Sequence, residues 1–174
     1  MDGERVGAGP RGPRHYRSWE HAFLGEWVAR SRPNARVLTH VGLGPIRPAT
    51  TDPQLDAAEL LGLSPWRRWA DALVIEPDRM ELIEAKILQT VAQTSQLELY
   101  AHLLPDTPEL AEFRGRRIDK IALVAIADPA ATFMARSVGI QVVVWRPPWI
   151  DEWMAVKEAR QRRAPRFKSS SPAR

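Results

Sequence analysis

The sequence predicts an α/β domain in which a central mixed β-sheet is flanked by helices, in the order helix, three strands, helix, strand, helix, strand. Three observations support this prediction. Aromatic residues recur at helical spacing near the N-terminus, a Pro-Asp turn joins two apolar stretches, and a strand, a short helix and a strand follow one another towards the C-terminus. With 174 residues, 44% of them hydrophobic, the chain is long enough for one domain with a substantial core.

The first helix is predicted to begin at Ser18, a suitable N-cap, and to end before the Arg-Pro-Asn break at residues 32–34. Trp19, Phe23 and Trp27 would share one face of this helix. The residues that follow predict a strand over 35–44, a loop over 45–54 and a short helix over 56–63.

The stretch "WADALVIEPDRMELIEAK", residues 69–86, predicts a β-hairpin. Pro77 is unsuited to a two-residue primed turn and favours a four-residue connection at residues 76–79 around a type I turn. The register that follows pairs Ile75 with Met80, Leu73 with Leu82, and Asp71 with Glu84.

The second half of the chain predicts two helices and two apolar strands before a last helix. Asp128 is a suitable N-cap with Pro129 at the first helical position, and Pro105 would end the preceding long helix. In order, we expect a helix over 88–104, a strand over 118–128, a helix over 129–139, a strand over 140–147 and a helix over 149–163.

Two carboxylates face each other across the predicted hairpin. Opposed side chains of neighbouring strands have Cβ atoms about 4.5–5.5 Å apart, and like charges at that separation destabilise a sheet unless something neutralises them. A divalent cation between Asp71 and Glu84 would do so. Lys86 lies on the same face as Glu84, whereas Ala85 points away and would offer only its carbonyl oxygen to the ion.

Two acids, a carbonyl and an ammonium form a set suited to the metal-assisted hydrolysis of a phosphodiester. The cation would offset phosphate charge and lower the pKa of a bound water, while Lys86 could orient that water or stabilise the developing charge. A simpler interpretation is a surface salt bridge among Asp71, Glu84 and Lys86 at the end of a sheet.

The pattern of Asp71 on one strand and Glu84-Ala85-Lys86 on the next resembles the PD-(D/E)XK nuclease superfamily. The resemblance implies a restriction-endonuclease-like fold over residues 18–146. It also implies a Mg²⁺ ion, with Mn²⁺ as a substitute, bound by Asp71, Glu84 and the Ala85 carbonyl. Lys86 would be the catalytic base or stabiliser.

Gln96 and Tyr100 on the helix after Lys86 resemble a motif of the RecB-like exonuclease branch of that superfamily. The two residues share a helical face with Gln89 and Gln93, and this polar stripe could hold DNA or orient Lys86. The alternative is an ordinary solvated face.

The resemblance further implies an acid from the first helix, for which Glu20 is preferred and Glu26 competes. The chain departs from the superfamily pattern at Ala70, where a proline is usual before the aspartate. The literal Pro-Asp pair at residues 77–78 lies at the hairpin tip, too close to Glu84 to reach the site.

Basic residues are concentrated at the two ends of the chain, and residues 157–174 carry seven of them against Glu158 alone. We expect a flexible basic arm over 1–15, a nuclease-like domain over 16–156 and a basic, disordered tail over 157–174. Such ends suit a polyanion, so DNA is the expected partner, although they could equally be solubilising tails. The tail residues expected to contact DNA are Arg160, Arg162, Arg163, Arg166 and Lys168.

Several features restrict other functions. The chain has no cysteine, which favours hard cations bound by oxygen ligands, and no apolar run long enough to cross a membrane, so we expect a soluble, cytoplasmic protein. The histidines, including His21 and His40, show no ligand spacing and are expected at the surface or at caps. The tryptophans, including Trp69, are expected to pack in the core or at its rim rather than to stack on bases.

The predicted function is therefore Mg²⁺-dependent hydrolysis of DNA, by an endo- or exonuclease. A homo-oligomer or a larger DNA-processing complex is compatible with it. One rival is a catalytically inactive module that keeps the nuclease fold and binds DNA or assembles a phage or mobile-element complex. The other is a small α/β protein whose acids only form salt bridges.

Overall fold

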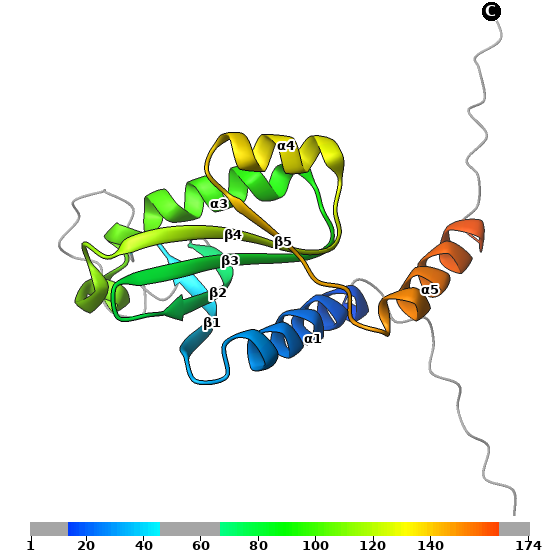
Figure 1. The fold of residues 1–174 in the computed structure, drawn as a ribbon, viewed down its shortest axis with the longest axis horizontal. Helices are drawn as coiled ribbons and strands as arrows, with labels where there is room; N and C mark the ends of the chain where they lie inside the picture. Colours follow the sequence, from blue (N-terminus) through cyan, green and yellow to red (C-terminus); the bar gives the residue numbers. More distant parts are fainter. Residues whose placement is uncertain (1–13, 46–66, 164–174) are drawn as a thin grey trace, which may run out of the picture.

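One mixed sheet of five strands, in the order β1-β2-β3-β4-β5, forms the centre of the computed structural model, which describes residues 14–45 and 67–163 (Figure 1). The first three strands are antiparallel neighbours, whereas β4 runs parallel to β3 and β5 runs parallel to β4. The strands are β1 (Arg36–Leu43), β2 (Arg68–Ile75), β3 (Arg79–Leu88), β4 (Arg117–Ile126) and β5 (Gln141–Val144).

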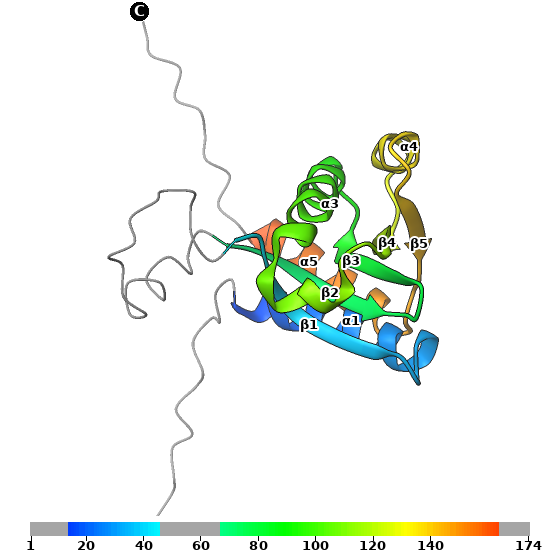
Figure 2. The same cartoon turned by 90° about the vertical axis from the view of Figure 1, so that its left-hand side faces the viewer.

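Helices cover both faces of the sheet (Figure 2). One face packs against α1 (Arg14–Ser31) and α5 (Ile150–Arg163), and the other against α3 (Val91–Leu103) and α4 (Pro129–Ser137). Two short 3₁₀ helices, η2 (Leu104–Asp106) and η3 (Pro108–Phe113), follow α3. The predicted α/β class, a mixed sheet flanked by helices, is confirmed.

The core consists of two clusters, one on each face of the sheet. Phe23, Trp27 and Trp153 pack on the first face together with strand residues such as Ile83 and Leu123. Leu73, Leu82, Leu97, Tyr100 and Phe113 are among those that pack on the second face. The tryptophans of the C-terminal segment therefore pack, as predicted, and Trp149 lies 5.2 Å from Trp19 between ring centroids.

The predicted hairpin register is confirmed for the pairs Ile75 with Met80 and Leu73 with Leu82. The third predicted pair, Asp71 with Glu84, is not part of the ladder, which ends at Ala72 and Ile83. The Glu76 N–H donates to the Arg79 carbonyl at 3.0 Å, which closes the connection at the expected place. Asp128 caps α4, since its carboxylate accepts from the Ala131 N–H at 2.8 Å.

Some element bounds differ from the predicted ones, for tertiary reasons. The strand β3 extends to Leu88, which the helical pattern assigned to the next helix, because Leu88 pairs with Ile126 of β4. The helix α1 begins at Arg14, four residues before the predicted Ser18 and within the predicted arm. The helix predicted over 56–63 lies outside the described residues.

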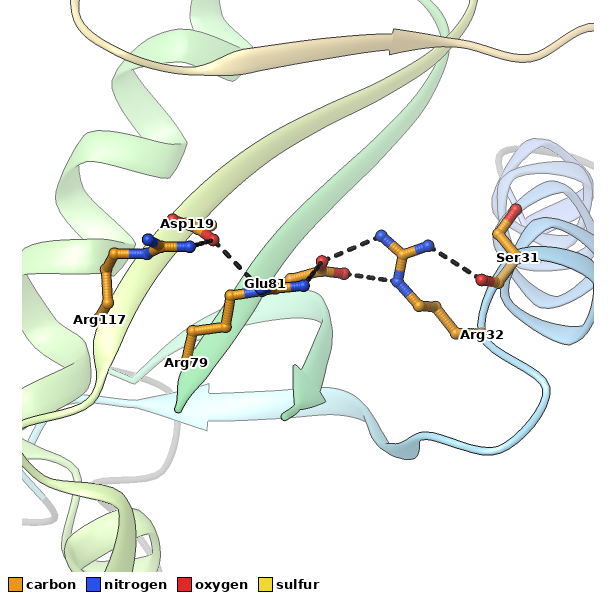
Figure 3. Close-up of polar contacts among 6 residues, drawn as sticks. All are labelled: Ser31, Arg32, Arg79, Glu81, Arg117 and Asp119. Carbon is orange, nitrogen blue, oxygen red and sulfur yellow. Dashed lines mark hydrogen bonds and ion pairs between the residues drawn. The ribbon is translucent and has the colours of Figure 1, made fainter. Parts of the chain in front are cut away.

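An ion-pair network joins the end of α1 to the sheet (Figure 3). The Arg32 guanidinium donates to both oxygens of Glu81 on β3, at 2.8 and 3.0 Å, and the Glu81 side chain is only 5% exposed. Arg79 lies 3.7 Å from Glu81 and 3.5 Å from Asp119 of β4. The network holds the C-terminal end of α1 against the first face.

Within the described parts of the chain, none of the helices has the length and hydropathy that crossing a bilayer requires.

Candidate active site

A cavity of about 260 Å³ lies where β2 and β3 separate. The ladder between these strands ends at the pair Ala72 and Ile83, after which β2 stays paired with β1 and β3 with β4. Helices from both faces reach this gap. All the side chains that the sequence assigned to catalysis line the cavity, namely Glu20, Asp71, Glu84, Lys86, Gln96 and Tyr100.

Asp71 occupies the position at which the ladder is interrupted. Its Oδ2 accepts a hydrogen bond from the Ala85 backbone N–H at 2.8 Å, so the carboxylate bridges two strands that no longer pair there. The Ala85 side chain points away into the core and is 1% exposed. Asp71 thus has a structural contact as well as a place on the cavity wall.

Glu84 and Lys86 form the charged centre of the cavity. Glu84 is 2% exposed, and its Oε1 lies 2.9 Å from the Lys86 Nζ. Lys86 also lies 3.9 Å from Asp71 Oδ2. The buried Oε2 of Glu84 has no hydrogen-bond partner among the described residues, which leaves one acceptor free to bind a further group.

The ionisation of these groups is coupled to their burial. Burial raises the pKa of Glu84 to about 7, Asp71 adds to the shift, and Lys86 opposes it. Burial works to lower the pKa of Lys86, but the charges of Glu84 and Asp71 outweigh it, so this pKa is raised and the ammonium stays charged. The negative neighbours therefore favour Lys86 as a cationic donor over Lys86 as a proton acceptor.

Glu20 reaches the cavity from α1, on the opposite face of the sheet from α3. Burial raises its pKa, while the charge of Lys86 and a hydrogen bond with the Ile87 backbone oppose the shift. The competing acid Glu26 is engaged elsewhere, because its carboxylate accepts from the Trp149 indole N–H at 2.9 Å.

The polar stripe on α3 is largely buried, and its alternative interpretation as a solvated face does not hold. Gln93 is 1% exposed and donates to the Glu84 backbone carbonyl at 2.7 Å. Gln96 and Tyr100 both line the cavity. Burial raises the pKa of Tyr100, with the charge of Glu84 adding to the shift and a side-chain hydrogen bond with Gln96 opposing it.

The helical spacing of the glutamines places Gln93 on the polar stripe, but its contact with the Glu84 backbone is apparent only in the structure. Gln89, just before α3, accepts from the Asp128 N–H at 3.0 Å and from the Thr132 hydroxyl at 2.7 Å, and so ties β3 to α4. In the sequence, only the recurrence of glutamines at helical spacing indicates that these side chains act together.

Four further residues line the cavity that the sequence did not assign to it, namely the apolar Leu24 and the ring-bearing His21, His40 and Trp69. Trp69 is 39% exposed, so it lies at the rim of the cavity and not in the core. The ring of His40 stacks on that of Trp69. The spacing of the histidines along the sequence does not reveal that His21 and His40 share a cavity, because they lie on different elements, α1 and β1.

The basic tail is only partly described. Residues 157–163, which the charge pattern places in a disordered tail, form the last turns of α5. Arg160 and Arg163 lie on this helix, and Arg162 is paired with Glu158 at 3.4 Å. Arg166 and Lys168 lie outside the described residues.

A divalent cation in this cavity would have few protein side chains as ligands. Across residues 14–45 and 67–163, no group of three or more Asp, Glu or His side chains is arranged to hold a metal ion. The free, buried Oε2 of Glu84 and the nearby carboxylate of Asp71 nonetheless suit a hard cation, which prefers oxygen ligands and completes its shell with water and substrate phosphates. The residues present therefore fit a Mg²⁺ ion held by two carboxylates.

No protein-family model and no curated protein matches this sequence. Among solved structures, a protein of unknown function is similar over 79% of this chain and 67% of its own, with 15% identity and a TM-score of 0.45. A repair endonuclease from Pyrococcus abyssi is similar over 73% of this chain and 47% of its own, with 13% identity and a TM-score of 0.39. Both likenesses are distant, and the chain spans about half the length of that endonuclease.

Proposed function

We propose that this chain is a metal-dependent deoxyribonuclease of the PD-(D/E)XK type, acting through Asp71, Glu84 and Lys86. The observation that supports the proposal is the meeting of these three residues with Gln96 and Tyr100 in one cavity, beside a buried carboxylate oxygen that lacks a partner. Buried acids with shifted pKa values beside a cation in a cavity are typical of catalytic sites.

Asp71 and Glu84 would hold a Mg²⁺ ion, with Mn²⁺ as a substitute, and the Ala85 carbonyl would be the third protein ligand. When bound, the cation supplies Lewis-acid chemistry, which offsets phosphate charge and makes water a better nucleophile. Lys86, kept charged by the two acids, would donate to the phosphate oxygen on which negative charge develops.

The residues of α3 would act by positioning. Gln93 donates a hydrogen bond to the backbone carbonyl of Glu84. This bond would restrict the movement of the Glu84 carboxylate. Gln96 and Tyr100 present an amide and a hydroxyl at the cavity wall, where they could orient the DNA backbone or the Lys86 ammonium. Glu20 would add a further acid from the opposite side.

A test combines DNA cleavage with thermal unfolding. In the wild type, Mg²⁺ or Mn²⁺ should raise the melting temperature and permit cleavage of linear, circular or single-stranded DNA. Asp71→Asn, which keeps an oxygen able to accept from Ala85, should abolish the metal-induced shift and lower cleavage by several orders of magnitude. Lys86→Ala should abolish cleavage but retain the shift.

The matched control is Asp119→Asn, which removes a carboxylate from the ion-pair network and lies outside the cavity. It should retain both the metal shift and cleavage. The salt-bridge interpretation, in which Glu84 and Lys86 only neutralise each other, requires no metal shift in the wild type and a modest loss of stability in either variant. That pattern would rule out the nuclease proposal.

A further inference from the structure

An aromatic pair lies at the rim of the candidate active site. His40 of β1 and Trp69 of β2 have ring centroids 4.4 Å apart and ring planes only 11° from parallel. Both side chains are exposed, and both line the cavity that contains Asp71 and Glu84. An exposed stack of two flat rings can be extended by a third flat ring.

The backbone at this pair is held in an unusual conformation. His40 has a φ of +52°, and among the described residues it is the only one other than glycine with positive φ. The flanking pairs, Thr39 with Ala72 and Val41 with Ala70, place His40 directly across from Asp71. A conformation that costs about 1 kcal/mol or more is retained only where the surrounding structure imposes it, and such positions are concentrated at functional sites.

In β1 and β2, the alternation of side chains between the two faces of the sheet is interrupted at the same point. Leu38 and Leu73 pack on the α3 side of the sheet, and so do Val41 and Ala70, three residues further along each strand. Strict alternation would place the second pair on the opposite side. The shared break lies at His40 and Asp71, so the same distortion places the aromatic ring and the carboxylate at one cavity.

The position of the Trp69 ring depends on Gly42, its partner on β1. A Cβ atom added at Gly42 would approach the Arg67 guanidinium to 3.1 Å and the Trp69 ring to 3.3 Å. Arg67 is itself held, because it donates to the Gly42 carbonyl and pairs with Glu109 at 2.6 Å. The Trp69 ring therefore lies beside a backbone segment and a guanidinium that are both held in place by hydrogen bonds.

From this arrangement we infer that His40 and Trp69 stack on an unpaired base of single-stranded DNA and direct the adjacent phosphate to Asp71 and Glu84. This inference rests on the proposed function and adds the substrate class to it. Bases within a duplex have both faces covered by neighbouring pairs, so this platform can accept a base only from a single strand or a locally unpaired end.

The test measures binding without cleavage, using the full chain in EDTA. The probes are a fluorescent single-stranded oligothymidylate and a duplex of equal length. Trp69→Ala should weaken binding of the single strand about 5- to 150-fold, which corresponds to the loss of one base–aromatic stack. Because stacking involves no phosphate, the dependence of binding on salt should keep its slope, and binding of the duplex should not change.

The design of the second variant follows from the backbone. His40→Asn removes the ring but retains a residue that tolerates positive φ, so it should weaken binding of the single strand without unfolding the chain. Trp69→Phe retains a ring and should bind more tightly than Trp69→Ala. Phe133→Ala is the matched control, since Phe133 is 76% exposed on α4 and does not line the cavity. It should bind as the wild type does.

The inference is wrong if Trp69→Ala and His40→Asn bind the single strand as tightly as the wild type, or if both lose single strand and duplex equally. Tighter binding of a single-stranded RNA than of the same DNA sequence would overturn the assignment to DNA. The failure of the two proposals can be distinguished. Cleavage that survives while the ring variants bind normally rejects only the platform, whereas ring-dependent binding without any metal-dependent cleavage rejects only the nuclease.

Discussion

Glu84 lies almost entirely out of solvent, and its burial next to Asp71 raises its pKa from an ordinary value of 4.5 to about 7. Between these pH values the folded state binds a proton that the unfolded chain has released. The free energy of unfolding should therefore fall as the pH rises through this window, and level off above it.

The first prediction follows from this shift. In EDTA, the wild type should lose roughly 1–3 kcal/mol of stability between about pH 5 and about pH 8, because an ionised Glu84 must then be kept in the core. Glu84→Gln stays neutral and should lose little of its stability over the same range. Urea unfolding at several pH values, with the midpoint and slope determined at each, measures the difference.

Glu109→Gln provides the control for that measurement. A hydrogen bond from Arg67 lowers the pKa of Glu109, so any contribution it makes to stability is lost only below its ordinary pKa. The control should therefore retain the wild-type profile in the window tested. Parallel profiles for the wild type and Glu84→Gln would contradict the buried, proton-binding state of Glu84.

At the scale of the element, α1 contributes Glu20, His21 and Leu24 to the cavity, so its position over the sheet decides the shape of the site. Trp19, Phe23 and Trp27 of α1 pack on the first face, and Arg32, just after its last turn, is bound to Glu81. The helix is thus attached by apolar packing along its length and by a partly buried ion pair at its end.

The second prediction concerns this ion pair. Arg32→Ala should lower the free energy of unfolding by about 1–3 kcal/mol, because Glu81 then keeps only the longer contact with Arg79 while remaining buried. Arg117→Ala, which removes a 65% exposed partner of Asp119, should cost much less, because solvent screens an exposed ion pair. Equal losses in the two variants, measured by urea unfolding, would show that burial of Glu81 does not matter.

The bounds of the elements show where local patterns fail. Pro77 and the alternation around it were sufficient to predict the hairpin and its register, because turn chemistry and period two act over a few residues. The extension of β3 to Leu88 was not predictable from the local pattern. It depends on pairing with Ile126, which lies far along the chain.

At the scale of the whole molecule, charge is distributed unevenly between the domain and the C-terminal end. The helix α5 packs through Ile150 and Trp153, which are 0% and 3% exposed, and its later turns carry the basic residues. A deletion from residue 157 would shorten a packed helix, so replacement of charges is a cleaner test of DNA binding than truncation.

The third prediction concerns the five basic residues of the C-terminal end that are expected to contact DNA. Replacing all five with glutamine should weaken DNA binding and reduce its dependence on salt. Each phosphate contact on a single strand contributes about 0.7 to the slope of log K against log salt, so the slope should fall by up to about 3.5. The substituted residues are Arg160, Arg162, Arg163, Arg166 and Lys168. Fluorescence anisotropy over a range of salt concentrations measures the slope.

Arg136→Gln, on the exposed surface of α4, is the control for this series. Arg136→Gln should change the slope by no more than the loss of a single phosphate contact would, about 0.7. If the fivefold variant binds with the wild-type slope, the tail does not contact phosphate and its charge serves another purpose, such as solubility or a protein partner.

By itself, the sequence determined the fold class and the fact that Glu84 and Lys86 share one side of the sheet. Both follow from short-range rules, namely helical spacing, strand alternation and the turn at Pro77. Only the tertiary structure decided how deeply Glu84 is buried, that Asp71 bonds the Ala85 N–H, and that His40 and Trp69 stack beside them. These features depend on the separation of β2 from β3 and on the packing of α1 and α3, which bring together residues that no local pattern relates.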